Sequence, residues 1–545
     1  MSAENLFKQI LLARGLKTEG QRDAFLNPSY DKKHDPFLLP DMSAAVERLV
    51  KAHKKQERIT IYGDYDIDGL TATTLLLDAL GQFEFRHVSA FIPNRFVEGY
   101  GLTVDAIERI AADGAKLIIT VDCGSLSHEP IARAKELGVD VIVTDHHNVA
   151  EVQPPAEAVI NPKRPDHKYP FIDLAGVGVA FKLVQALQTR LDGIPVGQEK
   201  WLLDLVALGT VCDVVTLVDE NRANVFWGLK VLAKTRRPGL KALMAVSRVE
   251  PDKLTTRSLG FMLGPRMNAA GRLETAQIAL DMLITDDPMV ALEKAERLDA
   301  LNLARRTDQD QIYKEALAQA EQLASDNVLV VSSPNWNHGI VGIVAAKLLE
   351  KYKKPTFVLQ EIGEESKGSA RSYGDFSAAD AIRASDGLIT KGGGHKLAAG
   401  VTLPTKNIAA FRKRVNEFYR AQKLVNQAAL LLPKADVTAE LKYVSEGLIN
   451  LLAGLEPFGN GNEQPILQSR HLQVVQTRRM GTEDQHVKFT LKDLQGSTLQ
   501  MLAFSAPDYF FVEPGEMINV WYQPDINEWQ GRRSVEGRLL HLEIA

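Results

Sequence analysis

The sequence contains few cysteines, no long uncharged hydrophobic segment and no signal-peptide pattern. Only Cys123 and Cys212 occur among 545 residues, and they form no Cys-x-x-Cys pair. We therefore expect neither a disulfide framework nor a structural zinc site, and we expect a reducing, cytoplasmic location. No run approaches the roughly 18 uncharged apolar residues of a membrane span, so no membrane partner is expected. The first 17 residues lack a small-residue cleavage site, which argues against a signal peptide.

An excess of basic charge is absent as well. The chain has 64 Lys and Arg residues against 69 Asp and Glu residues, a net charge of −5. This balance excludes a protein that coats nucleic acid by bulk charge, although a local basic groove remains compatible with it. Apolar residues make up 45% and charged residues 24% of the chain, which is typical of globular protein and excludes disorder and coiled-coil rods. A chain of this length is expected to form three or four domains.

The first half of the chain repeats a short hydrophobic run, a turn and a helical stretch. The runs at 59–62, 117–121 and 141–144 are continuously hydrophobic, as expected of strands that are buried on both faces of a parallel sheet. This alternation predicts a doubly wound α/β domain at 42–234, preceded by a lead segment at 1–41.

The second half is predicted to contain a helical connector, a smaller α/β domain and a β-barrel. Residues 287–325 have almost no Gly or Pro after their first turn and predict one or two long helices within a connector at 235–325. A second α/β domain is expected at 326–425. Short alternating runs within 426–545, separated by turn residues, predict a connector and a small barrel, with an OB-fold as the leading interpretation. The expected fold class is thus multidomain α/β.

An acidic turn follows the first predicted strand directly. In Gly63-Asp64-Tyr65-Asp66-Ile67-Asp68-Gly69, three carboxylates occupy alternate positions and would repel one another without a cation. A solvated acidic turn is the alternative. An EF-hand loop is disfavoured, because the twelfth position, where such a loop has Glu, is Leu75.

Further acidic and histidine residues follow other hydrophobic runs. Asp122 comes after 117–121, Asp145-His146-His147 after 141–144, and Asp213 after a later apolar stretch. The carboxyl ends of strands in an open α/β sheet converge on one crevice. Carboxylates together with imidazole suit Mn²⁺ or Mg²⁺, and an Asp shared by two ions would create a dinuclear site. We therefore predict a site for two such ions.

These motifs, taken in order, resemble a known superfamily. The D-x-D-x-D-G, Val-Asp-Cys-Gly and Asp-His-His elements are similar to those of the DHH phosphoesterases. Gly392-Gly393-Gly394-His395, preceded by the run at 368–372, resembles the associated DHHA1 domain. With the Arg-Met-Asn-Ala-Ala-Gly-Arg run at 266–272, the Trp-Asn-His-Gly run at 336–339 and a terminal barrel, the set is similar to bacterial RecJ-type single-strand-specific exonucleases.

The resemblance implies a role for each residue of the predicted site. One ion would be held by Asp66 and Asp122. The other would be held by Asp68, Asp122, His146 and Asp213, so that Asp122 bridges the two ions. His147 would face the scissile phosphate and complete the catalytic set. Tyr62 occupies the place where the pyrophosphatase branch has a metal-binding His, so Asp64 is the substitute ligand and pyrophosphate is disfavoured as a substrate.

A second group of residues is predicted to bind the substrate. Its members are Arg266, Asn268, Arg272, His338, Arg371, Ser372, Gly393, Gly394, His395 and Trp529. The glycine run with its flanking Arg, Ser and His is interpreted as a phosphate site, with a flexible turn as the alternative. The arginines of the 266–272 run could instead form interdomain salt bridges, and His338 could cap a helix or line the DNA path. Trp529, beside Arg532 and Arg533 on a predicted loop, is expected to stack bases, although barrel aromatics more often belong to the core.

The resemblance implies a metal-dependent exonuclease. It would degrade single-stranded DNA from the 5′ end to 5′-mononucleotides in DNA repair and recombination, with a single-strand-binding protein and a helicase as partners. One alternative is a DHH–DHHA1 phosphodiesterase of short oligonucleotides or cyclic dinucleotides, which the barrel and the long middle segment disfavour. The other is a non-catalytic DNA-binding scaffold, which the full set of acidic and histidine residues disfavours.

Overall fold

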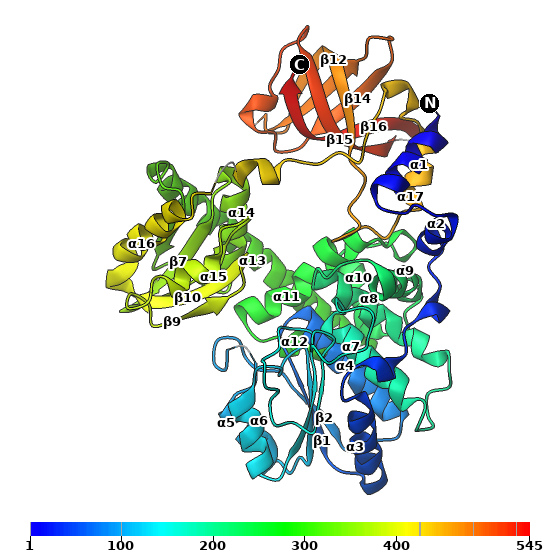
Figure 1. Ribbon diagram of the computed structural model, residues 1–545, viewed down its shortest axis with the longest axis vertical. Helices are drawn as coiled ribbons and strands as arrows, with labels where there is room; N and C mark the ends of the chain where they lie inside the picture. The colour runs from blue at the N-terminus through cyan, green and yellow to red at the C-terminus, as the bar shows by residue number, and fades with distance from the viewer. Residues whose placement is uncertain (1, 100, 425–426, 483, 530) are drawn as a thin grey trace. The chain divides into compact units, whose positions relative to one another are not determined.

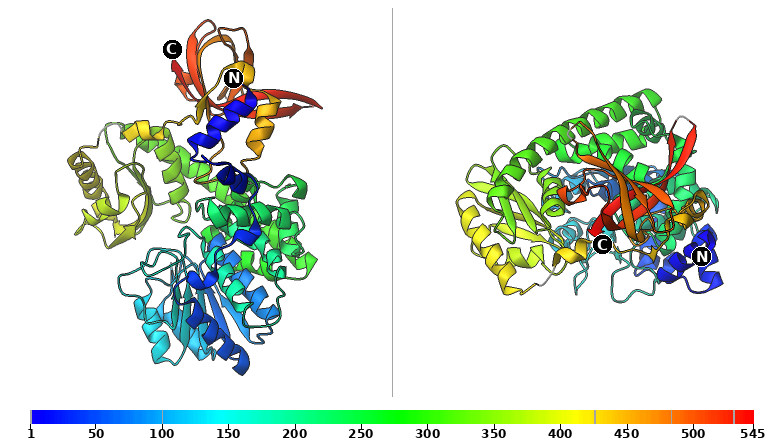
Figure 2. Two further views of the ribbon diagram at one scale, coloured as in Figure 1. Left: turned by 45° about the vertical axis from the view of Figure 1, so that its right-hand side comes forward. Right: turned by 90° about the horizontal axis from the view of Figure 1, so that it is seen from above.

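The computed structural model describes residues 2–99, 101–424, 427–482, 484–529 and 531–545. Within these ranges no helix has both the length and the hydrophobicity needed to cross a bilayer. The chain forms two compact units, shown in Figures 1 and 2. The first unit comprises Met1–Asn268, Ala276–Ala295 and Pro433–Ala545, and the second comprises Ala269–Thr275 and Glu296–Leu432.

The first unit begins with a parallel five-stranded sheet. Its strand order is β2 (Val88–Phe91), β1 (Ile59–Gly63), β3 (Leu117–Val121), β4 (Asp140–Thr144) and β5 (Ala158–Ile160). The chain runs from β1 to β2 on one side of β1 and then crosses to β3 on the other side of β1. The strand order therefore reverses between β1 and β3, where open α/β sheets bind their ligands.

Helices cover both faces of this sheet, which confirms the doubly wound prediction. Helices α5 (Val104–Ala112) and α6 (His128–Glu136) share one core with alternate strand side chains such as Tyr62, Ile118 and Val141. Figure 1 shows α5 and α6 on one side of the sheet and α3 (Met42–Lys55) on the other. The helices that follow the acidic turn and the later motifs, α4 (Ile67–Gln82) and α7 (Gly176–Leu187), pack against each other and against β1, β3 and β4.

A helical layer continues the first unit. It contains α8 (Leu203–Cys212), α9 (Asp219–Leu232), α10 (Pro238–Val246), a π-helix at Ser258–Leu263, α12 (Gln277–Ile284) and the first part of α11 (Gly264–Leu273), whose residues from Ala269 belong to the second unit. The long helix expected within 287–325 is found as the single helix α13 (Pro288–Gln322).

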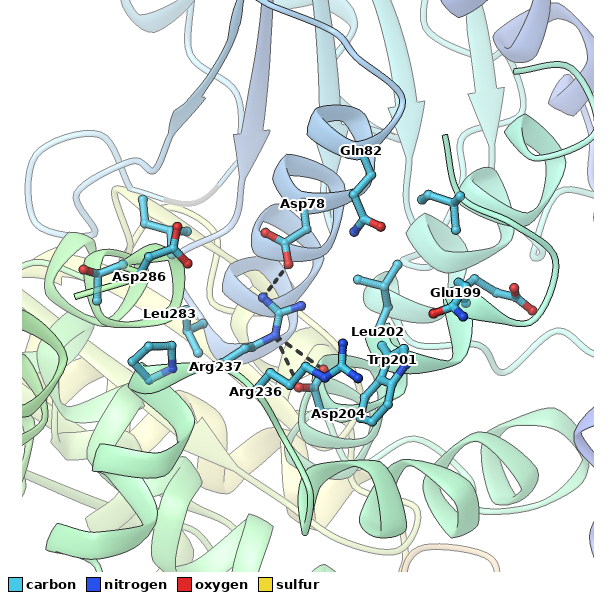
Figure 3. A pocket seen from close by; sticks show the side chains of 15 residues that line it. Asp78, Gln82, Glu199, Trp201, Leu202, Asp204, Arg236, Arg237, Leu283 and Asp286 are labelled. Carbon is cyan, nitrogen blue, oxygen red and sulfur yellow. Dashed lines mark hydrogen bonds and ion pairs between the residues drawn. The ribbon is translucent and has the colours of Figure 1, made fainter. Parts of the chain in front are cut away.

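An arginine joins helices α4 and α8 inside a pocket. Figure 3 shows Arg237 between Asp78 of α4 and Asp204 of α8. Its guanidinium nitrogens lie 2.5 Å from Oδ2 of Asp78 and 3.3 Å from Oδ2 of Asp204. Beside it, the Arg236 guanidinium stacks on Trp201, 4.1 Å from the ring centroid. Arg237 therefore connects the two helices whose ends carry Asp68 and Asp213.

The second unit has a mixed five-stranded sheet. Its order is β6 (Leu329–Ser333), β7 (Thr356–Ile362), β8 (Glu365–Arg371), β10 (Ala398–Pro404) and β9 (Lys391–Gly394), and only β6 and β7 pair in parallel. Helices α13 and α14 (Val341–Tyr352) share one core with the sheet, and α15 (Ala378–Arg383) and α16 (Ile408–Ala421) share the other. The glycine run at 392–394, for which a flexible turn was the alternative to a phosphate site, forms the exposed edge strand β9, because it pairs with β10.

The last part of the first unit is a closed β-barrel, as predicted. Strands β12 (Leu467–Met480), β13 (His486–Lys492), β14 (Thr498–Ala503), β16 (Arg532–Ile544) and β15 (Met517–Trp529) pair in this order, and β15 pairs with β12 to close the barrel. A short strand, β11 (Val437–Thr438), adds to β12. Helices α1 (Ala3–Ala13) and α17 (Glu446–Ala453) lie beside each other and contribute to the barrel core (Figures 1 and 2).

Two features of the barrel region differ from expectation. The lead segment contributes to the barrel, because Leu6 and Ile10 of α1 are buried in its core. Trp529, Arg532 and Arg533 were expected on a loop, but they end β15 and begin β16 of one hairpin. The side chain of Trp529 lies outside the described part of the structure, so base stacking by this residue stays a prediction.

Candidate metal centre

The acidic turn folds tightly between β1 and α4. Asp66 is the N-cap of α4 and accepts a hydrogen bond from the Gly69 amide at 3.1 Å, while Asp68 lies in the first helical turn. Gly69 is needed here because a Cβ would lie 2.5–2.8 Å from the backbone of Asp64. Carboxylates at a helix N-terminus are favoured by the helix dipole and by the unpaired N–H groups.

Asp68 is held by a second helix N-terminus. Its two carboxylate oxygens accept hydrogen bonds from the amides of Gly176 at 2.6 Å and Val177 at 2.8 Å, the first two residues of α7. Both oxygens are thereby oriented while the carboxylate stays buried. Sequence analysis missed these two amides, and the small residues of the Gly-Val-Gly-Val-Ala run at 176–180 were the available signal.

Asp122 directly follows β3 in a left-handed backbone conformation with φ of 62°. Left-handed conformations are uncommon outside glycine, but Asp tolerates them better than most residues. Gly176 packs directly on the Asp122 side chain, since a Cβ at Gly176 would lie 2.7 Å from Oδ1. The strand end and α7 together define the position of this carboxylate.

The Asp-His-His run follows β4, and its aspartate orients the histidines. Asp145 accepts hydrogen bonds from the amides of Ser125, His146 and His147 at 3.0, 2.7 and 3.0 Å. It also lies 2.9 Å from Nδ1 of His147. Asp145 was not among the predicted site residues, although its place in the motif was visible. Asp145 thus anchors the ring of His147 and the backbone of His146.

His146 brings the strand-end residues and the helix-end residue together. Its Nε2 lies 3.0 Å from Oδ1 of Asp122 and 3.5 Å from Oδ2 of Asp213. The same nitrogen lies 3.8 Å from Oδ2 of Asp68. Asp213 caps the C-terminal end of α8, so this carboxylate reaches the cluster from a helix instead of a strand.

The predicted ligands form groups of compatible geometry. In each group, one ligand atom per residue lies within 4.8 Å of the others. The groups are Asp64, Asp66 and Asp122; Asp68, His146 and Asp213; and Asp122, His146 and His147. The structure thus brings together every residue of the predicted metal and catalytic sets, and the assignment of each to an ion stays a prediction.

Burial and mutual repulsion dominate the electrostatics of this cluster. Burial, followed by neighbouring carboxylates, raises the pKa of Asp68 to about 7 and that of Asp213 to about 9. The same causes raise the pKa values of Asp64 and Asp122 well above the ordinary value. A bound cation would supply the missing positive charge.

The two histidines differ in their electrostatics. Burial and the neighbouring His147 lower the pKa of His146 to about 3, so its ring stays neutral as a metal ligand requires. Burial also lowers the pKa of His147, but the hydrogen bond and charge of Asp145 outweigh it, and the net pKa is raised. His146 is therefore suited to ligation and His147 to contact with an anion.

The residues present fit a cluster of divalent cations. Oδ1 of Asp64, Oδ1 of Asp122 and Nε2 of His146 are buried and make no hydrogen bond within the described ranges, although the last two atoms lie 3.0 Å apart. Buried polar atoms are almost always paired, so orphaned acceptors that converge on one place require another partner. Carboxylate oxygens with one imidazole nitrogen are ligands that Mn²⁺ and Mg²⁺ accept.

The residues of the 266–272 run are divided between the two units. Arg266 and Asn268 lie on α11 in the first unit, where Nη1 of Arg266 donates to the carbonyl oxygen of Met262. Arg272 belongs to the second unit, and its Nη1 donates to the carbonyl oxygen of Gly339 at 2.9 Å. Their contact with substrate stays a prediction.

The remaining predicted substrate residues lie in the second unit. His338 donates its backbone N–H to Oε1 of Gln360 on β7, and its ring Nδ1 lies 2.8 Å from the same oxygen. The buried Ser372 hydroxyl donates to the carbonyl of Phe376. His395 is exposed in the turn between β9 and β10, next to Gly393 and Gly394.

Arg371 has the environment of an anion-binding residue. It ends β8, and Nη1 donates to the carbonyl oxygen of Ala370. Burial lowers its pKa, and no carboxylate among the described residues acts to raise it. A half-buried guanidinium without a carboxylate partner gains most from a bound phosphate.

Comparison with known proteins adds the family. Residues 58–210 match the DHH family N-terminal domain, residues 325–421 match the DHHA1 domain and residues 435–541 match the RecJ OB domain. The single-stranded-DNA-specific exonuclease RecJ of Bacillus subtilis is 36% identical, over 97% of this chain and 66% of its own length. The corresponding protein of Dickeya dadantii is 35% identical, over 98% of this chain and 96% of its own length.

A solved structure agrees with this result. The crystal structure of RecJ in complex with Mn²⁺ from Thermus thermophilus has a TM-score of 0.84 and 30% identity. The match covers 99% of this chain and 76% of that one. The domain order, the full-length sequence relatives and the shared fold lead to one conclusion: this chain belongs to the RecJ family of single-stranded-DNA-specific exonucleases.

Proposed function

We propose that this chain hydrolyses the phosphodiester bonds of single-stranded DNA from the 5′ end, with two Mn²⁺ or Mg²⁺ ions, and releases 5′-mononucleotides. The observation that carries the proposal is the buried Asp–His cluster at the reversal point of the sheet, with orphaned acceptor atoms on Asp64, Asp122 and His146. The DNA substrate and the direction of cleavage follow from the resemblance to RecJ proteins.

In this proposal Asp64, Asp66 and Asp122 hold one ion. Asp68, Asp122, His146 and Asp213 hold the other, with Asp122 shared between them. Two such ions supply an acidified water nucleophile and stabilise charge on the attacking and leaving oxygens of an in-line displacement. The neutral His146 ring and the amides of α7 orient the ligands without adding charge.

His147 has a separate role in the proposal. Its Nδ1 is anchored by Asp145, whose charge favours the protonated ring. A protonated imidazole beside the cluster would donate to a non-bridging oxygen of the scissile phosphate and stabilise the charge that develops there. Asp145 thereby fixes both the direction and the charge of the ring.

Contacts away from the cluster would hold the strand. Arg371 and His395 are proposed to bind backbone phosphates, and the barrel is proposed to bind the DNA beyond the cleavage site. Action in the cytoplasm, in DNA repair and recombination, with a single-strand-binding protein and a helicase, belongs to the same proposal and follows from the resemblance.

The two alternatives are less well supported. A phosphodiesterase of short oligonucleotides or cyclic dinucleotides would not require the barrel, which matches the RecJ OB domain over residues 435–541. A non-catalytic scaffold would not require the convergence of these carboxylates and imidazoles. The complete cluster favours an enzyme.

Digestion of end-labelled DNA tests the proposal. Single-stranded and duplex oligonucleotides labelled at either end would be incubated with Mn²⁺ or Mg²⁺, and with EDTA. We expect labelled mononucleotide from the 5′-labelled single strand, none with EDTA and little from the duplex. Asp213→Asn should lose this activity, whereas Asp105→Asn, at an exposed position on α5, should keep it. Initial release from the 3′ end, or activity in EDTA, would overturn the proposal.

A further inference from the structure

We propose that Asn460, in the segment that leads into the barrel, positions the metal ligand Asp213; this inference rests on the metal site of the proposed function. The Asn460 side-chain amide donates to the carbonyl oxygen of Val214 at 2.9 Å. Its own backbone carbonyl oxygen accepts a hydrogen bond from the Leu217 amide at 2.7 Å. Both contacts lie in the loop that directly follows α8 and Asp213.

The backbone at Val214 explains why this loop needs support. Asp213 is the C-cap of α8, and Val214, the next residue, has φ of 61°. Helices commonly end with such a left-handed residue, but the position is usually glycine, and a β-branched residue there is an outlier. The Val214 side chain is 64% exposed, so its own burial does not offset the cost. Backbone contacts must therefore hold the conformation that ends the helix at Asp213.

The segment 457–462, which we call the strap, is itself held in place by hydrogen bonds. Gly459 and Asn462 exchange two backbone hydrogen bonds, of 2.9 and 3.0 Å. Arg222 of α9 is 2% exposed and donates to the carbonyl oxygens of Leu455, Glu456 and Pro457. The Asn462 amide donates to two of the same carbonyls. The strap is thus fixed to the helical layer on one side.

On its other side the strap packs closely on the loop after Asp213. A Cβ at Gly459 would lie 2.5 Å from the Leu217 side chain, so the two segments are in close contact. The same loop is connected to the start of α7, because Asn221 donates to the carbonyl oxygens of Thr216 and Asp173. Asp173 lies three residues before Gly176, whose amide binds Asp68. One network of hydrogen bonds and close contacts therefore reaches both Asp68 and Asp213, and Asn460 supports the part of it next to Asp213.

This arrangement gives the C-terminal part of the chain a role beyond binding DNA. No predicted metal ligand lies after Asp213, yet a residue 247 positions later in the sequence holds the backbone next to that ligand. Loss of the Asn460 donor should let the end of α8 relax and move the Asp213 carboxylate. The predicted consequence is weaker metal binding and slower chemistry, with little change in DNA binding.

Metal titration of the full chain tests this proposal independently of nuclease activity. Asn460→Ala removes the donor, and Asn460→Asp removes it at nearly constant size. Asn5→Ala, at an exposed position on α1, is the control. Isothermal titration with Mn²⁺ alone should show an affinity about 10-fold to 100-fold lower in both Asn460 variants, the range found when groups that orient metal ligands are lost. On a short oligonucleotide, kcat should fall with KM unchanged.

A second background separates positioning from a general structural effect. In Val214→Gly, glycine adopts the left-handed conformation without strain, so the helix end needs the hydrogen bond less. In the Val214→Gly background, Asn460→Ala should therefore lower the logarithm of the Mn²⁺ affinity by less than about half as much as it does when Val214 is present.

Three outcomes would overturn the proposal: unchanged Mn²⁺ affinity in Asn460→Ala, equal losses in both backgrounds, or wild-type affinity in Asn460→Asp. If Asn460→Ala fails to fold, Asn460→Asp carries the same comparison. A wild-type chain that binds Mn²⁺ but leaves single-stranded DNA intact would refute the proposed function alone, and the titrations would still decide the role of Asn460.

Discussion

Gly176 opens α7 at a point where no side chain fits, and substitution there should disable the metal centre without touching a ligand. A Cβ at this position would lie 2.7 Å from Cβ and Oδ1 of Asp122 and 2.9 Å from its Cγ. The amide of the same residue donates to Asp68 at 2.6 Å. In Gly176→Ala, either the Asp122 carboxylate or the start of α7 must move by about 0.7 Å to restore ordinary contact.

The size of the effect follows from this displacement. A misplacement of about 1 Å in an active site can cost about 100-fold in rate, so we expect kcat to fall about 30-fold to 100-fold. Overpacking of a dense site costs about 1–3 kcal/mol of folding free energy, and a 545-residue chain should remain folded with a modestly lower Tm. Mn²⁺ affinity should fall as well, because both Asp68 and Asp122 depend on this helix start.

Gly178 provides a matched control two residues later in the same helix. A Cβ there would lie 3.4 Å from the Leu174 side chain, an ordinary contact. Gly178→Ala should stabilise α7 by up to about 1 kcal/mol, because Ala is the better helix former, and should leave kcat unchanged. The assay is steady-state cleavage of a short single-stranded oligonucleotide, with thermal melts and Mn²⁺ titration of each variant. A folded Gly176→Ala protein with kcat within twofold of wild type would refute the steric argument.

Three further predictions concern the metal ligand Asp122, the proposed phosphate contact Arg371 and Arg237, which connects α4 and α8. Asp122→Ala should abolish the stabilisation by excess Mn²⁺, which is about 2.7 kcal/mol at 100 times Kd in the wild type and is measured as a rise in Tm, and should lower cleavage by several orders of magnitude; an unchanged rise in Tm would remove Asp122 from the site. Arg371→Ala should weaken binding equally across DNA sequences and reduce the salt dependence by about one unit, and a wild-type salt slope would return Arg371 to a structural role. Arg237→Met should lower the free energy of unfolding in urea by about 3–5 kcal/mol, because Asp78 and Asp204 would lose their partner inside the pocket of Figure 3. A loss below about 1 kcal/mol would show that solvent screens both ion pairs.

Local patterns in the sequence were sufficient to predict the fold class and the members of the metal cluster. The continuous hydrophobic runs at 59–62, 117–121 and 141–144 are strands of one parallel sheet. Because strands of such a sheet end at the same edge, the sequence alone predicts that Asp122 and His146 lie close together. The alternating carboxylates that end on Gly69 indicated a cation site, because they would repel one another without a positive charge nearby. The long helix was also visible as a stretch almost free of Gly and Pro, and the barrel as short alternating runs.

Features that depend on contacts between distant segments could not be predicted in this way. The glycine run at 392–394 has the composition of a turn, and only its pairing with β10 makes it a strand. The charged first half of β16 has the composition of a loop, and its pairing with β15 makes it a strand. Helix α1 has no pattern that assigns it to a barrel more than 400 residues later, since an amphipathic face does not specify its partner.

The sequence by itself indicated which acidic and histidine residues gather in one cluster, because repulsion between like charges and the hydrophobicity of buried strands are encoded in neighbouring residues. Only the tertiary structure decided what holds those residues in place. Asp68 is oriented by the start of α7, His147 by Asp145, and Asp213 by a helix end against which the strap packs. Such supports are hydrogen bonds and close approaches between segments up to 246 residues apart, and their energies depend on distances of a few tenths of an ångström that no local pattern records.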